Sequence, residues 1–239
     1  MTPWIRRTRR QFGLGVPSTA LVCPRYLKSI EIDDRARVDV RVERMLVFLK
    51  EPAADDLCDV IPLPPDAGGE IYESPDSREL HRTAGPNATT VYWAPREPIV
   101  RYGLYVHSYG WSSPGVPGEA AVYTEFRCDA RTAVAELELK APGAFEAAVA
   151  FRWPPWRRLG SVQRLVKYAL NQLESSEGQR PEVLDDGSRL RWTLASPQVG
   201  ERYACVAFHD QGVALWQNRI EASTLPARMR RLVKAVTSF

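Results

Sequence analysis

The sequence predicts a mostly β protein: an immunoglobulin-like antiparallel β-sandwich, followed by an α+β C-terminal part with a helix, a β-hairpin and two further helices. Three observations lead to this fold class. Apolar and polar residues alternate over 37–43 and in four runs of 99–153, which is typical of strands with one buried face. Glycine, proline and aspartate mark turns between these runs. Beyond residue 155 the apolar spacing changes to the helical period.

We expect three parts: a basic N-terminal segment over 1–24, a β-sandwich with long Pro-rich loops over 25–155, and an α+β segment over 156–239 that packs on the sandwich. The chain has 239 residues, of which 44% are hydrophobic and 26% charged. This composition is ordinary for a globular protein, and the length suffices for a core without disulfide or metal staples. It fits one domain or two.

The first strand is predicted at 37–43, where the alternation is strict. It continues into 45–49, which is apolar on both faces, so the sequence predicts either a bulge near Arg44 or burial on both sides. Prolines then recur over the next fifty residues or so. They indicate extended loops, with a strand at 89–93 and a capped helical turn at 74–79.

Residues 99–153 hold four alternating runs, separated by turn signals at 114–118, 129–131 and 142–143. This pattern predicts a four-stranded antiparallel meander. The Ala, Glu and Leu content of 132–140 favours a helix by propensity, but the period of two favours a strand, and we follow the period.

The C-terminal part is predicted from its apolar spacing. A helix is expected from Ser161 to about Gly178, then a hairpin with strands near 190–194 and 203–208. Two more helices follow, over 211–223 and from Pro226 onwards. The residues of the first helix that we expect to pack on the sheet are Leu165, Leu170 and Leu173.

Positive charge is concentrated at the two ends of the chain. The net charge is +3, from 32 Lys and Arg against 29 Asp and Glu. Eight of the cations lie in 1–22 and 225–239, which contain no acid, so the body between them is acidic. Such ends suit an anionic membrane surface, a nucleic-acid backbone or an acidic partner, and they equally suit a solvated face. The eight are Arg6, Arg7, Arg9, Arg10, Arg228, Arg230, Arg231 and Lys234.

The sequence contains no complete catalytic motif, and we expect no catalytic residue, metal or cofactor. The stretch 110–114 (GWSSP) lacks the final glycine of a nucleophile elbow. The histidines at 81, 107 and 209 have no companion at metal-ligand spacing. The four cysteines are far apart and form no C-x-x-C pair, so we interpret them as reduced and mostly buried. These observations favour a protein that is not an enzyme.

The most unusual pattern is an aromatic stripe on one predicted strand. Because successive side chains alternate across a strand, Tyr105, His107, Tyr109 and Trp111 share one face. Such a stripe could stack on a ligand or a partner's side chain. The alternative is that it packs against a second sheet, which is the usual role of aromatic rows in sheets.

Three functions are consistent with these observations. The first is a non-catalytic binding module, adaptor or structural subunit of a larger intracellular assembly, with a protein partner. The second is a small-molecule-binding protein or enzyme whose pocket lies on the Tyr105, His107, Tyr109 and Trp111 face. The third is peripheral membrane or nucleic-acid association through the basic termini. We expect no transmembrane segment, because no run of about 18 apolar residues occurs. Since no signal-peptide core follows the first basic residues, we expect a cytoplasmic location.

Overall fold

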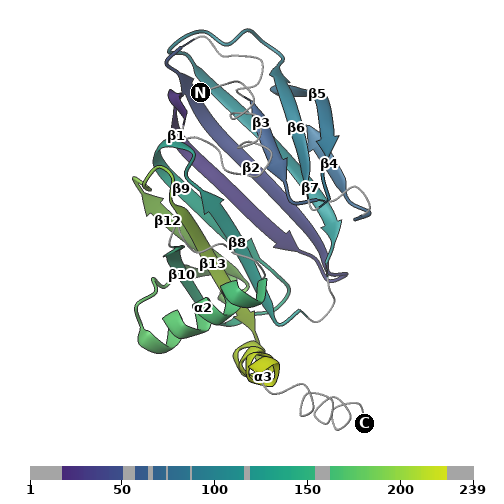
Figure 1. Cartoon of the computed structure of the whole chain (residues 1–239), viewed down its shortest axis with the longest axis vertical. Coiled ribbons are helices and arrows are strands. Elements are labelled where there is room, and N and C mark those ends of the chain that lie inside the picture. The colour runs from purple at the N-terminus through teal and green to yellow at the C-terminus, as the bar shows by residue number, and fades with distance from the viewer. Residues whose placement is uncertain are drawn as a thin grey trace.

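The computed structural model describes residues 18–50, 57–63, 67–73, 75–86, 88–115, 119–153 and 162–224, and these residues are mostly β with few helices. Figure 1 shows the arrangement. The helical elements are α2 (Val162–Ser175), α3 (Gly212–Thr224) and the short 3₁₀ turn η1 (Asp185–Gly187). The strands are β1 (Ser18–Ile32), β2 (Arg37–Phe48), β3 (Cys58–Ile61), β4 (Glu70–Glu73), β5 (Ser77–Ala84), β6 (Thr89–Pro95), β7 (Leu104–Pro114), β8 (Ala121–Arg127), β9 (Ala130–Lys140), β10 (Phe145–Trp153), β11 (Glu182–Leu184), β12 (Arg189–Ala195) and β13 (Arg202–His209).

The strands form one large sheet and two small ones. The large sheet has seven strands in the order β11-β12-β9-β1-β2-β7-β4. Its neighbours are antiparallel except β1 and β9, which run parallel. The small sheets, β10-β13-β8 and β3-β6-β5, are antiparallel and lie on the same face of the large sheet, which we call its inner face.

The main core lies between the inner face and the two small sheets. Alternation along β2 shows why: Val40, Val42, Leu46 and Phe48 are buried on the inner face, whereas Arg41 is exposed on the opposite, outer face. A second core lies between the sheet β10-β13-β8 and the two helices, which pack on the side of that sheet away from the large sheet.

Local predictions from periodicity are largely confirmed. Strands occur at 37–43 and 89–93, and helices occur at 162–175 and 212–224. Leu165 and Leu170 are buried in the second core and Leu173 packs at its margin, as predicted. Trp192 and Trp216 are likewise buried. The helix expected from Pro226 and the eight terminal cations lie outside the described residues.

The predicted strand pairings were wrong. The four strands of the expected meander, β7 to β10, all exist, but none is hydrogen-bonded to the next. Instead β7 lies between β2 and β4, β9 between β1 and β12, and β8 and β10 flank β13. The expected hairpin is also absent, because β12 joins the large sheet and β13 joins a small one. Periodicity reports which residues are buried, and it carries no information on which distant strand covers them.

The structure also differs from the sequence predictions in local detail. The expected helical turn at 74–79 is replaced from Ser77 onwards by strand β5. Of the two alternatives for the change of pattern near Arg44, a bulge in β2 is not observed on the side of β7, with which β2 pairs in continuous register from Arg37 to Val47. The register irregularity lies in the other neighbour, β1, between Val22 and Arg25, opposite Met45 and Val47 of β2, and β1 itself was not predicted.

The coarse prediction of a mostly β protein whose sheets pack face to face is therefore confirmed, with mixed and antiparallel sheets. The immunoglobulin-like arrangement and the division into parts at residues 24 and 155 stay predictions. Within the described residues, none of the helices has both the length and the apolar character needed to cross a bilayer.

Candidate functional site

The aromatic stripe lies on the inner face of β7. The rings of Tyr105 and His107 are 6.3 Å apart between centroids, those of His107 and Tyr109 5.4 Å, and those of Tyr109 and Trp111 6.2 Å. His107 is fully buried and Trp111 is buried, whereas Tyr105 and Tyr109 are partly exposed. Trp93 of β6 packs its ring against both His107 and Tyr109, at 5.8 Å from each. The small sheet β3-β6-β5 thus covers the centre of the stripe.

A chain of polar contacts runs from this stripe through the core. Arg44 of β2 donates from Nη2 to Oδ2 of Asp59 in β3, at 2.8 Å. His107 Nε2 lies 3.0 Å from the same Asp59 oxygen. On the other side of its ring, His107 Nδ1 lies 2.8 Å from Oγ of Ser77 in β5. We call Arg44, Asp59, His107 and Ser77 the buried polar chain.

The protons of the buried polar chain follow from its geometry. A neutral His107 that carries its proton on Nε2 donates to Asp59 and accepts at Nδ1 from the Ser77 hydroxyl. The Tyr105 hydroxyl lies 2.9 Å from Ser77 Oγ and 3.0 Å from the backbone oxygen of Asp76, and it donates to one of them. The hydrogens of His107 and Ser77 then each have an acceptor, whereas Nε of Arg44 is buried without one.

In the buried polar chain, burial and neighbouring charges shift the pKa values in opposite directions. Burial alone would raise the pKa of Asp59, but the Arg44 guanidinium and the hydrogen bond from His107 outweigh it and hold that pKa below its usual range. Burial lowers the pKa of His107 and Asp59 opposes this, with a net decrease. The pKa of Arg44 is raised, because Asp59 outweighs burial. At neutral pH the chain therefore holds an ionised Arg44–Asp59 pair beside a neutral His107.

The contacts from Asp59 to His107 and from His107 to Ser77 have the connectivity of a catalytic triad, but the serine is not accessible to a substrate. A triad serine must reach a substrate carbonyl with its oxygen. The Ser77 side chain is fully buried, at 0% exposure, and its oxygen already contacts Tyr105 and His107. The buried polar chain instead joins β2 and β7 of the large sheet to β3 and β5 of the small sheet. Its role is to fix one sheet on the other.

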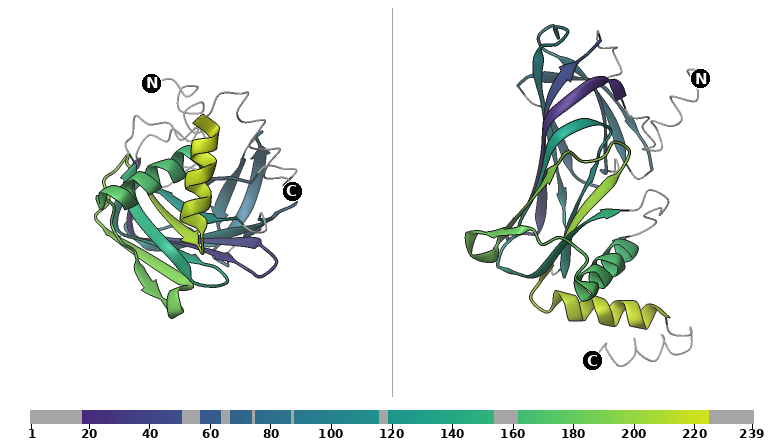
Figure 2. Two further views of the ribbon diagram at one scale, coloured as in Figure 1. Left: turned by 90° about the horizontal axis from the view of Figure 1, so that it is seen from below. Right: turned by 90° about the vertical axis from the view of Figure 1, so that its left-hand side faces the viewer.

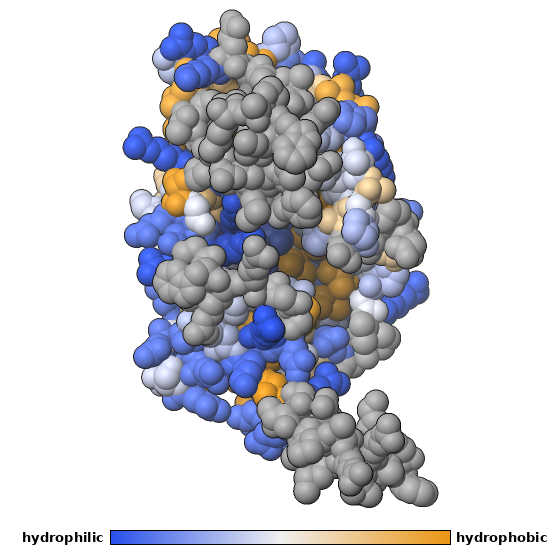
Figure 3. Space-filling view, in the orientation of Figure 1, coloured by the Kyte–Doolittle hydropathy of each residue, from blue (hydrophilic) through white to orange (hydrophobic). Residues whose placement is uncertain are grey.

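A half-buried lysine lies beside the stripe. Lys28 of β1 projects from the inner face, and its Nζ donates to the backbone oxygen of Glu125, on the edge strand β8, at 3.0 Å. The same nitrogen lies 5.9 Å from the centre of the Trp111 ring. Burial lowers the pKa of Lys28 to about 8, and the nearby Glu125 carboxylate only partly opposes this. Figure 3 shows that this face of the molecule is hollowed near its middle, with apolar and polar side chains in the hollow.

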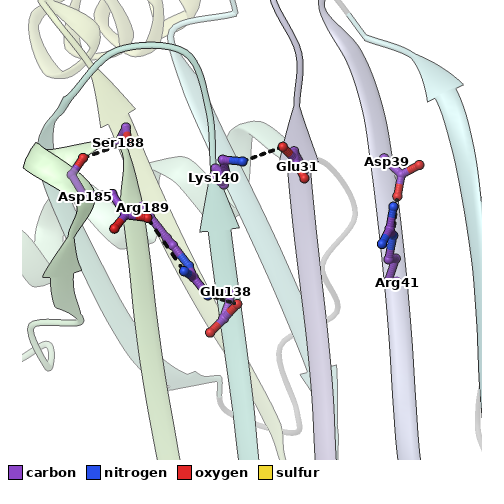
Figure 4. Close-up of polar contacts among 8 residues, drawn as sticks. All are labelled: Glu31, Asp39, Arg41, Glu138, Lys140, Asp185, Ser188 and Arg189. Carbon is purple, nitrogen blue, oxygen red and sulfur yellow. Dashed lines mark hydrogen bonds and ion pairs between the residues drawn. The ribbon is translucent and has the colours of Figure 1, made fainter.

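The outer face of the large sheet carries a different polar arrangement, drawn in Figure 4. Lys140 of β9 pairs with Glu31 of β1 at 2.6 Å, and Arg189 and Arg191 of β12 both bind Glu138 of β9, at 3.0 and 2.7 Å. A shallow cavity of about 260 Å³ opens among these pairs. Its lining residues are Ser29, Ile30, Glu31, Asp39, Arg41, Glu138, Lys140, Asp185 and Arg189.

Sequence reasoning identified the aromatic stripe but missed Lys28, Arg44, Asp59 and Ser77. Two of these could have been found from the sequence, because Lys28 and Arg44 occupy positions on strand faces that are otherwise apolar. Lys28, for example, lies on one face between Tyr26 and Ile30. Asp59 and Ser77 lie in short strands without clear periodicity. Among the described residues, no three His, Cys, Asp or Glu side chains group as metal ligands would, and none of the cysteines forms a disulfide.

Comparison with known proteins gives a weak likeness of fold only. No family model matches the chain, and no curated protein matches it. A Parabacteroides distasonis protein proposed to be a protease is 8% identical, with a TM-score of 0.48 over 80% of this chain and 41% of that one. Native leukotriene A4 hydrolase from Saccharomyces cerevisiae is 9% identical, with a TM-score of 0.40 over 86% of this chain and 33% of that one. An E323A mutant of an M1 zinc metallopeptidase from Deinococcus radiodurans is 10% identical, with a TM-score of 0.39 over 80% and 43%. This chain spans less than half the length of each.

Proposed function

We propose that the protein is a non-catalytic binding module, an adaptor or structural subunit of a larger intracellular assembly, and that it binds a protein partner. The observation that carries this proposal is the complete burial of Ser77. The one set of described residues with the connectivity of a nucleophile, a base and an acid is used to hold two sheets together. Because these side chains are buried and stabilise the packing of the sheets, we expect recognition to occur at the surface of the protein.

The outer face of the large sheet is the surface best suited to a partner. Both described helices lie on the opposite side of the molecule, as the right-hand view of Figure 2 shows. Cations and carboxylates are interspersed across β12, β9, β1 and β2. Complementary charge patterns of this kind favour specificity and fast association over raw affinity. We therefore expect a partner with a mixed-charge surface, whose affinity for this protein decreases as the salt concentration rises.

Matched pairs of substitutions test this surface. Arg41→Gln with Lys140→Gln removes two exposed cations from the outer face, and Arg164→Gln with Lys167→Gln removes two exposed cations from α2. A partner is first captured from the native cell extract, identified by mass spectrometry and purified. The outer-face variant should then bind the purified partner about tenfold more weakly, as expected for the loss of two charge contacts. Equal binding by both variants would refute the outer face as the binding surface.

A second candidate, small-molecule binding, is favoured by the partly exposed Tyr109 and by the hollow that this face of the molecule shows in Figure 3. The stripe of Tyr105, His107, Tyr109 and Trp111 would form one wall of the pocket. A ligand held there should quench tryptophan fluorescence, since Trp111 belongs to the stripe. Substitution Tyr109→Leu should weaken the quenching, and Tyr123→Leu on the edge strand β8 is the control.

The third candidate, association through the basic termini, rests on the charge asymmetry of the sequence. Replacement of Arg6, Arg7, Arg9 and Arg10 by Gln should reduce sedimentation with anionic liposomes at low salt. Replacement of Arg228, Arg230, Arg231 and Lys234 forms the second variant. Sedimentation that is unchanged in both would exclude this candidate. Fractionation of native cells tests the cytoplasmic location in the same preparation.

A further inference from the structure

Lys28 differs from the other lysines of the chain in its position. The protein has five lysines, Lys28, Lys50, Lys140, Lys167 and Lys234. Within the described part of the chain, Lys50, Lys140 and Lys167 are exposed to solvent. Lys28 alone of the described lysines is half-buried, in a row of the inner face between Tyr26 and Ile30. Placing an amine in a core is costly unless it is paired or loses its proton.

The contacts of Lys28 do not neutralise its charge. Its Nζ donates to a neutral backbone oxygen, that of Glu125, and lies over the Trp111 ring. None of the ion pairs among the described residues includes Lys28, whereas Lys140 binds the Glu31 carboxylate at 2.6 Å. The ammonium form of Lys28 is thus stabilised by a carbonyl dipole and a ring face, and by Glu125 only at a distance.

This environment leaves a reactive amine at neutral pH. Burial brings the pKa of Lys28 to about 8. At pH 7 roughly one molecule in ten then carries the neutral amine, against fewer than one in a thousand for an ordinary lysine with a pKa of about 10.4. Only the neutral amine is a nucleophile, and lysines that are activated in this way form imines with carbonyl compounds.

One aromatic ring lies beside the amine, and further rings follow on the same face of the sheet. Trp111 lies under Nζ, and Tyr109 follows Trp111 in the stripe at 6.2 Å. Tyr26, two residues before Lys28 on the same face of β1, packs its ring on that of Phe126 of β8, with 4.4 Å between the ring centroids. Stacked or tilted arrangements with such rings favour a planar aromatic ligand. The hollow in Figure 3 lies on the face where the edge of β8 and the inner face of the large sheet meet.

We propose that Lys28 is a covalent binding site for aromatic aldehydes, which it holds as an imine against Trp111. The Nζ lone pair attacks the aldehyde carbon, and the C=O π electrons move to oxygen to give a carbinolamine. The C–O bond then breaks, the oxygen leaves as water with two protons from the amine and solvent, and a C=N bond remains. No oxidant or reductant is needed. The proposal rests on the small-molecule candidate and is independent of the protein partner.

Reductive trapping tests the site in the full-length protein. Native protein is treated at pH 7 with benzaldehyde and sodium cyanoborohydride, and the benzylated lysines are quantified by peptide mass spectrometry. Lys28 should be labelled at least about tenfold faster than Lys140, because its amine is far more often neutral. The preference should disappear in denaturing guanidinium. Labelling of Lys28 that is no faster than that of Lys140 in the native protein would overturn the proposal.

Two controls separate the imine from binding itself. Lys28→Arg keeps the positive charge but cannot form the imine, so it should lose the fast-labelled site, whereas Lys140→Arg should keep it. Benzyl alcohol has the same ring and no carbonyl, and its binding is followed by saturation-transfer NMR. Binding of benzyl alcohol without trapping of benzaldehyde would overturn the imine and leave the small-molecule candidate standing. Absence of both would overturn both.

Discussion

The two faces of the large sheet use the same charged residue types for opposite purposes. On the inner face, Arg44 and Asp59 form an ion pair whose side chains are 22% and 7% exposed. On the outer face, Lys140 and Glu31 form a pair whose side chains are 52% and 53% exposed. Coulomb attraction grows as water is excluded, and so does the cost of leaving one partner alone. We therefore expect burial, more than distance, to decide what an ion pair contributes to stability.

The inner pair also has a property that the outer pairs lack. Arg44 and Asp59 belong to different sheets, and His107 and Ser77 extend their contact to β7 and β5. The outer pairs join strands that already share backbone hydrogen bonds, such as β9 with β1 and β12. We therefore expect the inner residues to govern how the sheets pack, and the outer residues to govern solubility and recognition.

The largest expected effect comes from removing one charge of the inner pair. Asp59→Asn keeps the shape of the side chain but leaves the Arg44 guanidinium without its anion. We expect a loss of about 3–5 kcal/mol in the free energy of unfolding, the usual result for breaking a buried pair. Urea denaturation measures it. Asp39→Asn, which removes the partly exposed partner of Arg41, is the matched control and should change stability by less than about 0.5 kcal/mol. Similar losses in both variants would contradict the expectation that burial decides the contribution of an ion pair.

The pH dependence of stability tests the neutral state of His107. Burial lowers the pKa of His107 in the folded protein below its value in the unfolded chain. As pH falls below about 6.5, the unfolded chain takes up a proton first, so stability should decrease. His107→Gln should flatten this part of the curve of unfolding free energy against pH. His209→Gln is the control, because burial also lowers the pKa of His209, at the end of β13, without a carboxylate contact. A slope that responds only to His209 would show that folding does not lower the pKa of His107.

A smaller effect is expected for the best-connected acid of the outer face. Glu138 accepts hydrogen bonds from Arg191 and Arg189, which outweigh burial and lower its pKa. Glu138→Gln should cost about 1 kcal/mol at low salt and less at high salt, because the arginine side chains remain about one-third exposed. Thermal unfolding at two salt concentrations measures this. A cost that is independent of salt would mean that packing, and not charge, supplies it.

The smallest effect is expected for Glu31→Gln. The Lys140–Glu31 pair is half exposed, so its removal should change the free energy of unfolding by less than about 0.5 kcal/mol. This substitution separates the effect of distance from that of burial, because the distance between the charged atoms, 2.6 Å, is shorter than the 2.8 Å of the inner pair. A cost near that of Asp59→Asn would show that distance outweighs burial.

The sequence predicted elements well where one face of a strand or helix is apolar. The helix α2 and the strands β2 and β7 to β10 follow directly from period and turn signals. Strand β1 was not predicted, because Pro24 and Arg25 interrupt the alternation of its apolar and polar residues. The register irregularity between Val22 and Arg25 accommodates the proline, which has no N–H to donate to the ladder.

The candidate site was only half predictable, for a physical reason. The stripe on β7 belongs to one strand, so alternation alone places its side chains together. The partners of the stripe come from β2, β3 and β5, and their contact depends on pairings that local periodicity does not encode. Arg44 was the exception. The pattern breaks at this residue, which the sequence alone explains by a bulge or by burial on both sides, and in the structure the break marks a charge that points into the core.

The parallel pairing of β1 with β9 sets the order in which the large sheet can be completed. Glu31 and its partner Lys140 are separated by 109 positions in the chain. At synthesis rates of about 5–20 residues per second, one edge of β1 waits on the order of 5–20 s for its neighbour. An unpaired strand edge invites pairing with other chains. The nascent protein therefore passes through a period in which its longest strand is open to aggregation, and chaperone binding during that interval should raise the yield of folded chains.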